Sequence, residues 1–477
     1  IDEAPTFILI INILLILLVV FWGRRRSARS TMMWVMVMSI FPIAGFIFYL
    51  FMGSDMRRSN MFSLKNSEDK KVREITTTQL EEWKEGKLYY SDVDDYNELI
   101  AINLKTDNSI LMSENECDLF FDGKEKFRSL LHDIDHAKES IDIQYYIVHS
   151  DELGKRVMQH LMVAAQKGVK VRFLVDAVGG RRLKQSDVRA MENSGCEVSV
   201  FFPSYFQHIN LRFNYRNHRK IVVIDNKIGY IGGFNVGDEY LGQNGKFGYW
   251  RDTHIRISGS AAAALKIRFL QDWYYASGKD PENEPEFQII PHKVGNIPMQ
   301  LVTSGPDTTY HNIKHAMLKM IYSANKSIYI QTPYLIPDDT FMEALIIAIT
   351  QGVEVNIMIP NKPDHPIVYW ATTSYAGELI QHGAKVYKYN NGFLHAKVMM
   401  IDDTITMIGS ANMDERSFSL NFEASEIIYS EEISKKIHKQ FYKDVKYSTL
   451  ISKSIYEKRS LIQRIKEPIA RLFSPIL

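Results

Sequence analysis

Two short segments of the sequence carry the same five residue types at the same offsets: a histidine, a lysine two residues later, and then an aspartate, a glycine and an asparagine. The residues are His218, Lys220, Asp225, Gly232 and Asn235 in the first segment, and His395, Lys397, Asp402, Gly409 and Asn412 in the second. The probability that both copies arise by chance is on the order of 0.001. The repeated pattern therefore indicates a function rather than two ordinary histidines at strand ends.

The histidines and lysines of the two segments suit phosphoryl transfer. Side chains two residues apart on a strand share a face, so His218 and Lys220 are expected to point into the same space, as are His395 and Lys397. One histidine would attack phosphorus while the other protonates the leaving oxygen. The lysines would stabilise the charge that grows on the phosphate oxygens in the transition state.

The other polar residues of each segment are expected to assist. Asn235 and Asn412 would donate hydrogen bonds to phosphate oxygens, which makes them candidate phosphate-binding residues. Asp225 lies five residues after Lys220, an odd offset, and in a regular strand it would face the other way. This predicts a structural role in which the aspartate pairs with turn amides.

A nucleophilic histidine also needs an acceptor that holds its second ring nitrogen. A carboxylate follows each motif: Asp252 comes 34 residues after His218, and Glu423 comes 28 residues after His395. We expect each carboxylate to orient the histidine that it follows, and the alternative is an ordinary surface carboxylate. The chain lacks the carboxylate cluster that Mg²⁺-dependent phosphotransfer requires, so no metal or cofactor is expected.

The elements that must position these residues are repeated as well. Residues 137–146 match 324–334, and residues 166–175 match 350–359; in the second pair a helix ends at Gly168 or Gly352 before a buried strand. Together with the histidine segments, these are three matched pairs in the same order. The sequence therefore predicts an α/β fold with two similar lobes, residues 109–290 and 291–477, that share one site.

The N-terminal region predicts a membrane anchor. Residues 6–22 and 31–52 are uncharged runs, so residues 1–53 are predicted to form a transmembrane helical hairpin, followed by a juxtamembrane linker at 54–108. A secretory signal peptide is the alternative for the first run, but its arginines follow the run instead of preceding it. Basic residues on the two sides of the hairpin nearly balance, which leaves its orientation open.

Composition narrows the remaining classes. The 57 Lys+Arg oppose 56 Asp+Glu, which argues against a nucleic-acid-binding protein, and only Cys117 and Cys196 are available for a disulfide.

Aliphatic residues recur at helical spacing near the C-terminus: Ile462, Ile465, Ile469, Leu472 and Ile476. Basic residues lie between them, so this amphipathic tail is expected either to contact a membrane surface or to dock on a lobe.

Several loop and aromatic residues are weaker candidates for the site. Residues 179–182 and 361–365 follow equivalent strands of the two lobes, and both loops are expected to border the site or to be simply solvated. Tyr145, Tyr146 and Tyr334 are expected either to line the pocket or to belong to the core.

The two H-x-K-x4-D-x6-G-[GS]-x-N segments are similar to the catalytic motif of the phospholipase D superfamily, in which Asp225 and Asp402 would be motif members. The wider stretches RNHRKIVVIDNKIGYIGGFNVGDEYLG, GYWRDTH, IQTPYLIPDD, NGFLHAK and NMDERSFSLNFE resemble bacterial cardiolipin synthases with two such motifs. The resemblance covers nearly the whole chain. It implies two phospholipase-D-like lobes, each a mixed sheet flanked by helices, behind the membrane hairpin.

The resemblance also implies an activity. One phosphatidylglycerol would donate its phosphatidyl group to His218 and release glycerol, and a second phosphatidylglycerol would accept the group, with His395 as general acid and then base. Glu423 matches the histidine-orienting carboxylate of the family, and Asp252 holds the corresponding place in the first lobe with a shorter side chain. A multi-pass location in the bacterial cell membrane, with the lipid bilayer as partner and the lobes on the cytoplasmic side, is implied as well.

Three rival activities use the same fold. Water as the acceptor would make the protein a phospholipase D, and serine would make it a phosphatidylserine synthase. A membrane-bound phosphodiesterase or nuclease fits the balanced charge and the hydrophobic N-terminus less well. A non-catalytic lipid-binding scaffold would be expected to have lost a histidine or lysine in one lobe, whereas both copies are intact. The sequence leaves the oligomeric state open.

Overall fold

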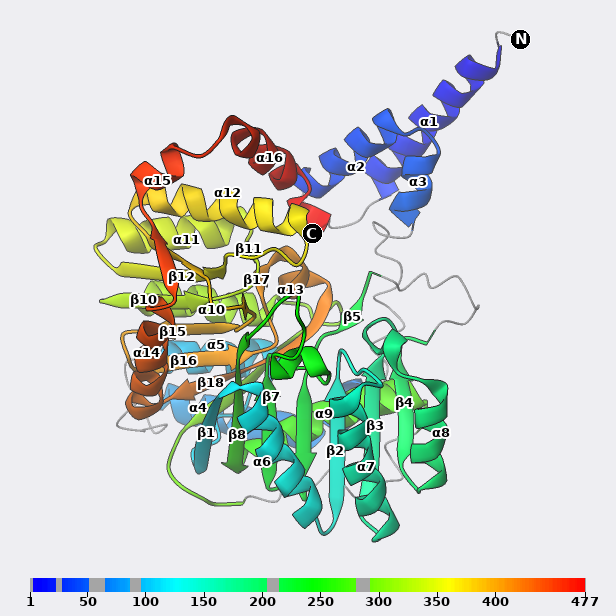
Figure 1. Cartoon of the computed structure of the whole chain (residues 1–477), viewed down its shortest axis with the longest axis vertical. Coiled ribbons are helices and arrows are strands. Elements are labelled where there is room, and N and C mark those ends of the chain that lie inside the picture. The colour runs from blue at the N-terminus through cyan, green and yellow to red at the C-terminus, as the bar shows by residue number, and fades with distance from the viewer. Residues whose placement is uncertain are drawn as a thin grey trace.

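Each lobe is built on a mixed β-sheet (Figure 1). The computed structural model describes residues 3–22, 28–50, 65–85, 96–203, 214–279 and 292–476. The first sheet has the strand order β1 (Asn115–Asp122), β8 (Trp250–Gly259), β7 (Ile228–Gly232), β6 (Ile221–Ile224), β2 (Ser140–Tyr145), β3 (Lys170–Asp176), β4 (Glu197–Phe201). The second has the order β19 (Ser448–Ile451), β13 (Lys385–Tyr389), β12 (Glu354–Pro360), β10 (Ser327–Gln331), β15 (Val398–Ile401), β16 (Ile405–Gly409), β18 (Asn421–Tyr429), β5 (Arg216–Asn217), with β9 (Met299–Ser304) also on β18.

The two sheets share one topology. Strands β2, β3 and β4 are parallel, as are β10, β12 and β13 in the second sheet. The strands that carry the repeated segments, β6–β7 and β15–β16, run antiparallel to their neighbours. The predicted α/β class is therefore confirmed, with two mixed sheets that are consistent with a duplicated lobe.

Helices flank both sheets. They are α6 (Gly123–His136), α7 (Glu152–Gln166), α8 (Gln185–Asn193) and α9 (Ala261–Ser277) in the first lobe, and α10 (Asn312–Ser323), α11 (Asp339–Thr350), α12 (Pro366–His382) and α14 (Glu431–Val445) in the second. Asp151 and Asp338 cap α7 and α11 by accepting hydrogen bonds from backbone N–H groups of the first turn. Gly168 and Gly352, with φ of 92° and 91°, follow the ends of these helices, as predicted.

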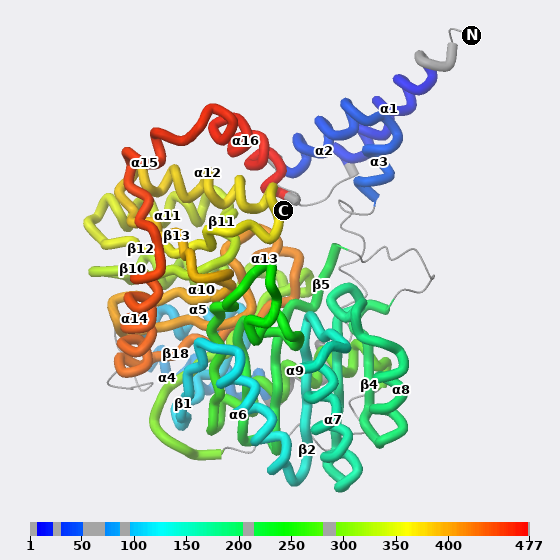
Figure 2. The backbone as a smooth tube through the Cα atoms, in the orientation of Figure 1, coloured from blue at the N-terminus to red at the C-terminus, as the bar shows by residue number. Residues whose placement is uncertain are grey.

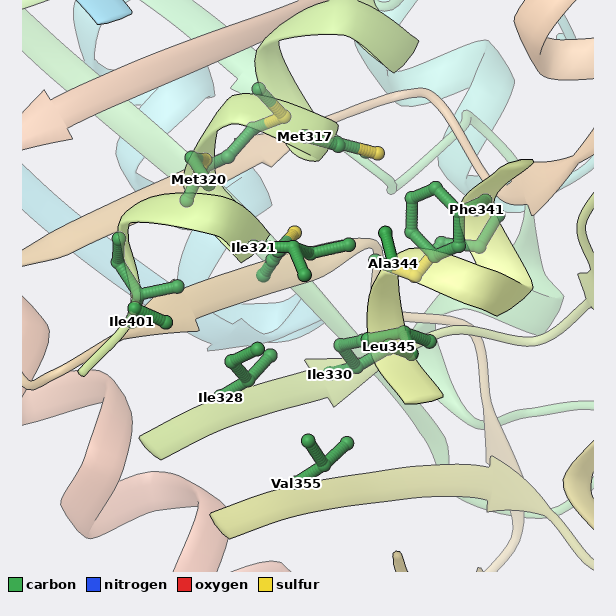
Figure 3. Close-up of a cluster of buried hydrophobic side chains, with 14 of the residues drawn as sticks. Met317, Met320, Ile321, Ile328, Ile330, Phe341, Ala344, Leu345, Val355 and Ile401 are labelled. Atoms are coloured by element: carbon green, nitrogen blue, oxygen red, sulfur yellow. The ribbon is translucent and has the colours of Figure 1, made fainter. Parts of the chain in front are cut away.

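The core of the second lobe lies between helices α10 and α11 and the strands beneath them (Figure 3). Its central side chains are Met317, Met320, Ile321, Phe341, Ala344 and Leu345 from the helices, and Ile328, Ile330, Val355 and Ile401 from β10, β12 and β15. Each of them is at most 3% exposed. This packing fixes the position of β15, which carries the second histidine segment.

A separate core joins the two lobes. Helix α9 contributes Phe269, Leu270 and Trp273 to a buried cluster that includes residues of both sheets, such as Val223 on β6 and Met400 on β15. Because this cluster is shared, the two sheets cannot shift against one another without opening it. The relative position of the two histidine segments is therefore set by close packing.

Part of the chain that precedes the first lobe packs into the second lobe. Helix α4 (Lys65–Lys84) is followed by α5 (Asn97–Asp107), whose Leu99, Ile100 and Leu104 are buried in the core of the second lobe. Asn103 Nδ2 also donates to Gln300 Oε1, at 3.1 Å. Within the stretch 54–108 that the sequence analysis assigns to a linker, α5 thus packs on the second lobe, because the second lobe buries its apolar face.

The N-terminal helices form an arm next to the second lobe (Figures 1 and 2). They are α1 (Glu3–Trp22), α2 (Ala28–Ile40) and α3 (Ala44–Phe48), packed around buried Val19, Trp34 and Met38. The run 31–52 does not form one helix, because α2 ends before Pro42, and Ile43 has a φ of 62°. In the ranges that the structure describes, no helix is both long and apolar enough to cross a bilayer. The predicted loop arginines Arg24–Arg26 lie outside the described residues.

Candidate active site

The two lobes exchange short strands at the site. Strand β5 of the first lobe pairs in parallel with β18 of the second, and β14 (Phe393–Leu394) of the second pairs in parallel with β8 of the first. A histidine follows each exchanged strand. His218 N donates to Phe422 O at 2.9 Å, and His395 N donates to Arg251 O at 2.7 Å. Each histidine is therefore anchored to the opposite lobe.

This exchange decides which carboxylate each histidine contacts. His218 Nδ1 lies 2.9 and 3.0 Å from Glu423 Oε1 and Oε2, and His395 Nδ1 lies 2.7 Å from Asp252 Oδ2. The sequence had placed each carboxylate with the histidine that it follows, and that pairing is wrong. Glu423 stands on β18 beside β5, and Asp252 stands on β8 beside β14, so both pairs cross between the lobes.

A buried carboxylate lies against Nδ1 of each ring, and Lys397 Nζ also lies 2.8 Å from His395 Nδ1. Burial acts to raise the pKa of Glu423, but His218 and Lys220 overcome it and hold that pKa below its usual value. In the same way, burial is outweighed at Asp252 by Lys397 and His395, so the pKa of Asp252 is lowered. Two ionised carboxylates favour a proton on each Nδ1, which leaves each Nε2 as the ring nitrogen for chemistry in the cavity.

The two motif lysines are buried beside the histidines. Lys220 Nζ donates to His218 O at 2.6 Å, and Lys397 Nζ donates to His395 O at 2.5 Å. Burial lowers the pKa of Lys220 to about 7 and that of Lys397 to about 8. Burial, together with the nearby Lys397, also lowers the pKa of His395 to about 4, and burial lowers the pKa of His218. Burial therefore disfavours positive charge at these groups, and a nearby anion would offset that cost.

A cavity of about 570 Å³ brings the pieces together. Its lining includes both histidines and both motif asparagines: His218, His395, Asn235 and Asn412. Asn235 Nδ2 donates to Tyr240 OH at 3.1 Å, while Asn412 Oδ1 is buried without a hydrogen-bond partner among the described residues. The cavity therefore receives side chains from both lobes, as the duplicated motif predicted.

The motif aspartates lie elsewhere. Asp225 accepts hydrogen bonds from the backbone N–H groups of Lys138, Glu139 and Ser140, at 2.7 to 3.0 Å. Asp402 accepts from the backbone N–H groups of 325–327, at 2.7 to 2.8 Å. Both residues occupy turns at the far ends of β6 and β15 and do not line the cavity, so their inclusion among catalytic residues is corrected to the structural role that strand alternation indicates.

Other residues complete the lining. Tyr146 and Tyr334 line the cavity, as do Arg182 and two residues of the loop 361–365, whereas Tyr145 is buried in the core with its OH bonded to Lys126. Sequence reasoning missed other lining residues, among them Arg216, Trp250 and Arg416. Arg216 lies two residues before His218 and Trp250 lies two residues before Asp252, and that proximity was the available signal for these two. The Trp250 ring centroid lies 5.1 Å from that of His395.

Comparison with known proteins places this arrangement in a family. The family described as "Cardiolipin synthase, PLD-like domain" matches residues 130–273 and 317–445, and the family described as "Phospholipase_D-nuclease N-terminal" matches residues 10–54. A cardiolipin synthase of Listeria welshimeri is 46% identical over 473 residues, and the major cardiolipin synthase of Bacillus subtilis is 45% identical over 475 residues; each alignment covers 98% of both chains.

A solved structure supports the same fold. The phosphatidylserine synthase of Haemophilus influenzae superposes with a TM-score of 0.62 at 14% identity, covering 80% of this chain and all of that chain. At such low identity the likeness concerns the fold alone. The sequence families and the full-length relatives, together with the paired histidine segments, lead to one conclusion: the chain belongs to the cardiolipin synthases, phosphatidyltransferases of the phospholipase D superfamily.

Proposed function

We propose that the protein transfers a phosphatidyl group from one phosphatidylglycerol to another through a covalent intermediate on His218, and that it releases glycerol. One observation carries this proposal: two imidazole–carboxylate pairs from opposite lobes face the same cavity beside two buried lysines. A site with two such pairs supplies a nucleophile and a separate acid–base group for the same phosphorus atom.

In the first step, the Nε2 lone pair of His218 attacks phosphorus and forms a P–N bond. The bond between phosphorus and the glycerol oxygen breaks, and that oxygen takes a proton from Nε2 of His395. Glu423 holds the Nδ1 proton of His218 and stabilises the positive charge that the ring acquires. Glycerol then leaves the cavity.

In the second step, a hydroxyl of another phosphatidylglycerol gives its proton to Nε2 of His395 and attacks phosphorus. The P–N bond breaks, cardiolipin forms, and His218 returns to its neutral state. His395 therefore ends the cycle with the proton that it lost in the first step. Asp252 keeps the His395 ring in the required tautomer through both steps.

The buried lysines stabilise the phosphate. A bound phosphodiester carries a negative charge, which favours the protonated forms of Lys220, Lys397 and His395, whereas burial alone favours their neutral forms. Two ammonium groups and the Asn235 and Asn412 amides would surround the oxygens on which charge develops. Asp225 and Asp402 keep the turns that carry these strands in place.

The N-terminal arm would bring the site to its lipid substrate. We propose that residues 1–53 insert in the bacterial cell membrane as a hairpin and hold the lobes on the cytoplasmic face. The arm exposes large apolar side chains, including Phe7, Leu14 and Phe21, which water solvates poorly and lipid would cover. Tethering raises the local concentration of lipid head groups at the cavity.

Product analysis tests the proposal. The purified full chain is incubated with phosphatidylglycerol vesicles, and lipids and free glycerol are quantified for the unsubstituted chain, His218→Ala and His395→Ala. We expect cardiolipin and glycerol in equal amounts from the unsubstituted chain and neither from the two variants. Phosphatidic acid in place of cardiolipin would make water the acceptor, and phosphatidylserine formed on addition of serine would reassign the acceptor class.

The covalent step has its own test. The reaction is quenched after a single turnover with radiolabelled phosphatidylglycerol, and the labelled peptide is identified. We expect label on the peptide that contains His218 and none in His218→Ala. Label on the His395 peptide would exchange the two roles.

A further inference from the structure

The C-terminal helix α16 (Leu461–Leu472) docks on the second lobe through its polar side. Glu467 is buried and accepts hydrogen bonds from Tyr456 OH at 3.2 Å and Arg459 Nε at 2.9 Å. Arg471 donates to Glu378 Oε2 on α12 at 2.5 Å, and its guanidinium lies 4.2 Å from the Tyr375 ring centroid. Charged groups, together with the buried Ala470, therefore attach this helix to the protein.

The opposite side of α16 is apolar and uncovered. Its large side chains are Leu461, Ile462, Ile465, Ile469 and Leu472, which are 51 to 72% exposed. At about 100° per residue they fall within an arc of roughly 100°, and Glu467 lies on the far side of the helix from them. A soluble protein normally turns such a stripe toward its core. Here the stripe points away from the lobe.

The helix has a fixed start and a fixed end. Ser460 and Gln463 form a capping box at its N-terminus. After its last turn, Ser474 Oγ accepts from Tyr375 OH at 3.1 Å, and the 3₁₀ turn η6 (Ser474–Ile476) contacts both α2 of the N-terminal arm and α13 (Glu415–Ser419). Helix α13 carries Arg416, which lines the cavity. The turn that follows α16 thus lies against both the arm and the helix that carries Arg416 (Figure 2).

We propose that α16 is an interfacial helix whose apolar stripe lies in the surface of the lipid bilayer and holds the active-site cavity against the head groups. The inference rests on the proposed membrane placement of the arm, which the turn after α16 contacts. Its occupant is an anionic bilayer, because residues 453–472 contain six basic and two acidic residues. An apolar stripe bordered by lysines and arginines is the pattern of helices that lie in a membrane interface.

The first test measures lipid contact directly. A fluorophore is attached to the full chain at Ile465→Cys, and the labelled protein is reconstituted in vesicles of phosphatidylglycerol and phosphatidylcholine. Quenching of the fluorophore by brominated lipid is then compared with quenching of the same label at Leu14→Cys on α1 and at Lys435→Cys on α14. Burial raises the pKa of the native Cys117 and Cys196 thiols, so both label slowly at pH 7, and the unsubstituted chain gives their background. We expect quenching at 465 and 14, and none above background at 435.

The outcomes separate this inference from the placement of the arm. Quenching at 14 without quenching at 465 would overturn the proposal for α16 and leave the arm in the membrane. No quenching at either position would overturn both. Protection of the label at 465 that depends on protein concentration in detergent would identify a second copy of the chain as the partner of the stripe, and would also overturn the proposal.

A second test uses activity. The triple variant Ile462→Ser, Ile465→Ser, Ile469→Ser leaves Glu467 and Ala470, the buried residues of α16, unchanged. We expect its KM for phosphatidylglycerol in vesicles to rise severalfold while kcat in detergent micelles stays unchanged. Leu450→Ser, on the exposed side of β19, serves as the control for loss of one large exposed aliphatic side chain. An unchanged KM in vesicles for a folded triple variant would contradict the proposal.

Discussion

The two histidines that line the cavity differ in how firmly their carboxylates are held. Glu423 presents both oxygens to His218 Nδ1, and it also accepts hydrogen bonds from Asn421 Nδ2 and Ser410 Oγ. Asp252 presents one oxygen to His395 and the other to its neighbouring amide, Thr253 N. A carboxylate with more donors is held in one position, so the His218 ring is better oriented for nucleophilic attack than the His395 ring.

The crossed pairing predicts which step each carboxylate serves. In Glu423→Gln, the new amide would either donate a hydrogen bond to His218 Nδ1 or fail to accept the proton of that nitrogen. Glycerol release in a single turnover should therefore slow by up to about 10⁴-fold, which is the cost of the wrong tautomer. Glu426→Gln, a buried glutamate three residues along the same strand, is the matched control and should leave the rate unchanged. If Asp252→Asn instead abolished formation of the His218 intermediate while Glu423→Gln spared it, the pairing in each lobe would be that of the sequence order.

The lysines predict a pH dependence of substrate binding. Their lowered pKa values, about 7 for Lys220 and about 8 for Lys397, mean that both lose their protons as the pH rises from 7 to 9. The attraction for a phosphodiester falls with that charge, so KM for phosphatidylglycerol should rise with pH, by about tenfold per unit once a required proton is lost. Steady-state kinetics from pH 6 to 9 measure this rise. Lys220→Arg keeps its charge over this pH range and should flatten the rise of KM with pH. A KM that is independent of pH in the unsubstituted chain would contradict the role of the lysines.

At the scale of elements, the exchange of β5 and β14 determines the site. The repeated histidine segments and the α/β class could be predicted because they depend on local spacing and strand patterns. The crossed carboxylates could not, because two-residue strands such as Phe393–Leu394 have no periodicity to mark them. Arg416 was missed for a related reason. It follows the second motif in the sequence, and the short helix α13 brings it to the cavity.

A glycine controls the second exchanged strand. Gly392 precedes β14 with a φ of 99°, and a Cβ there would lie 1.9 Å from Tyr249 O. Gly392→Ala should therefore separate β14 from β8, displace His395 and lower the free energy of unfolding by roughly 1–3 kcal/mol, with loss of most activity per folded molecule. Gly352→Ala has a φ of 91° but no atom within 4 Å of its Cβ, so it should cost about 1 kcal/mol and keep activity. Thermal unfolding and kcat distinguish them, and equal activity in both variants would show that β14 does not position His395.

At the scale of the whole molecule, the duplication was visible in the sequence, but the way the lobes combine was not. The shared core around α9 buries side chains of both sheets, and Arg251 of the first lobe forms a buried ion pair with Asp444 of the second at 2.8 Å. Such contacts join residues nearly two hundred positions apart, where no local pattern connects them. The N-terminal arm shows the opposite case. Hydrophobic run length predicted a second span over 31–52 that tolerates a kink at Pro42, whereas the structure divides this run into α2 and α3 on either side of Pro42.

One cavity per chain leads to a prediction about mixtures. Both imidazole–carboxylate pairs and the exchanged strands lie within a single chain, so one chain supplies the complete site. His218→Ala and His395→Ala are mixed in equal amounts, either by unfolding and refolding them together in vesicles or by co-expression. The mixture should therefore make no cardiolipin above the level of either variant alone. A mixture of the unsubstituted chain with either variant should retain half of its activity per total protein, which controls for inhibition by the inactive partner. Recovery of activity in the double-variant mixture would instead mean that the lobes exchange between chains, so that His218 of one chain and His395 of another act on the same phosphate.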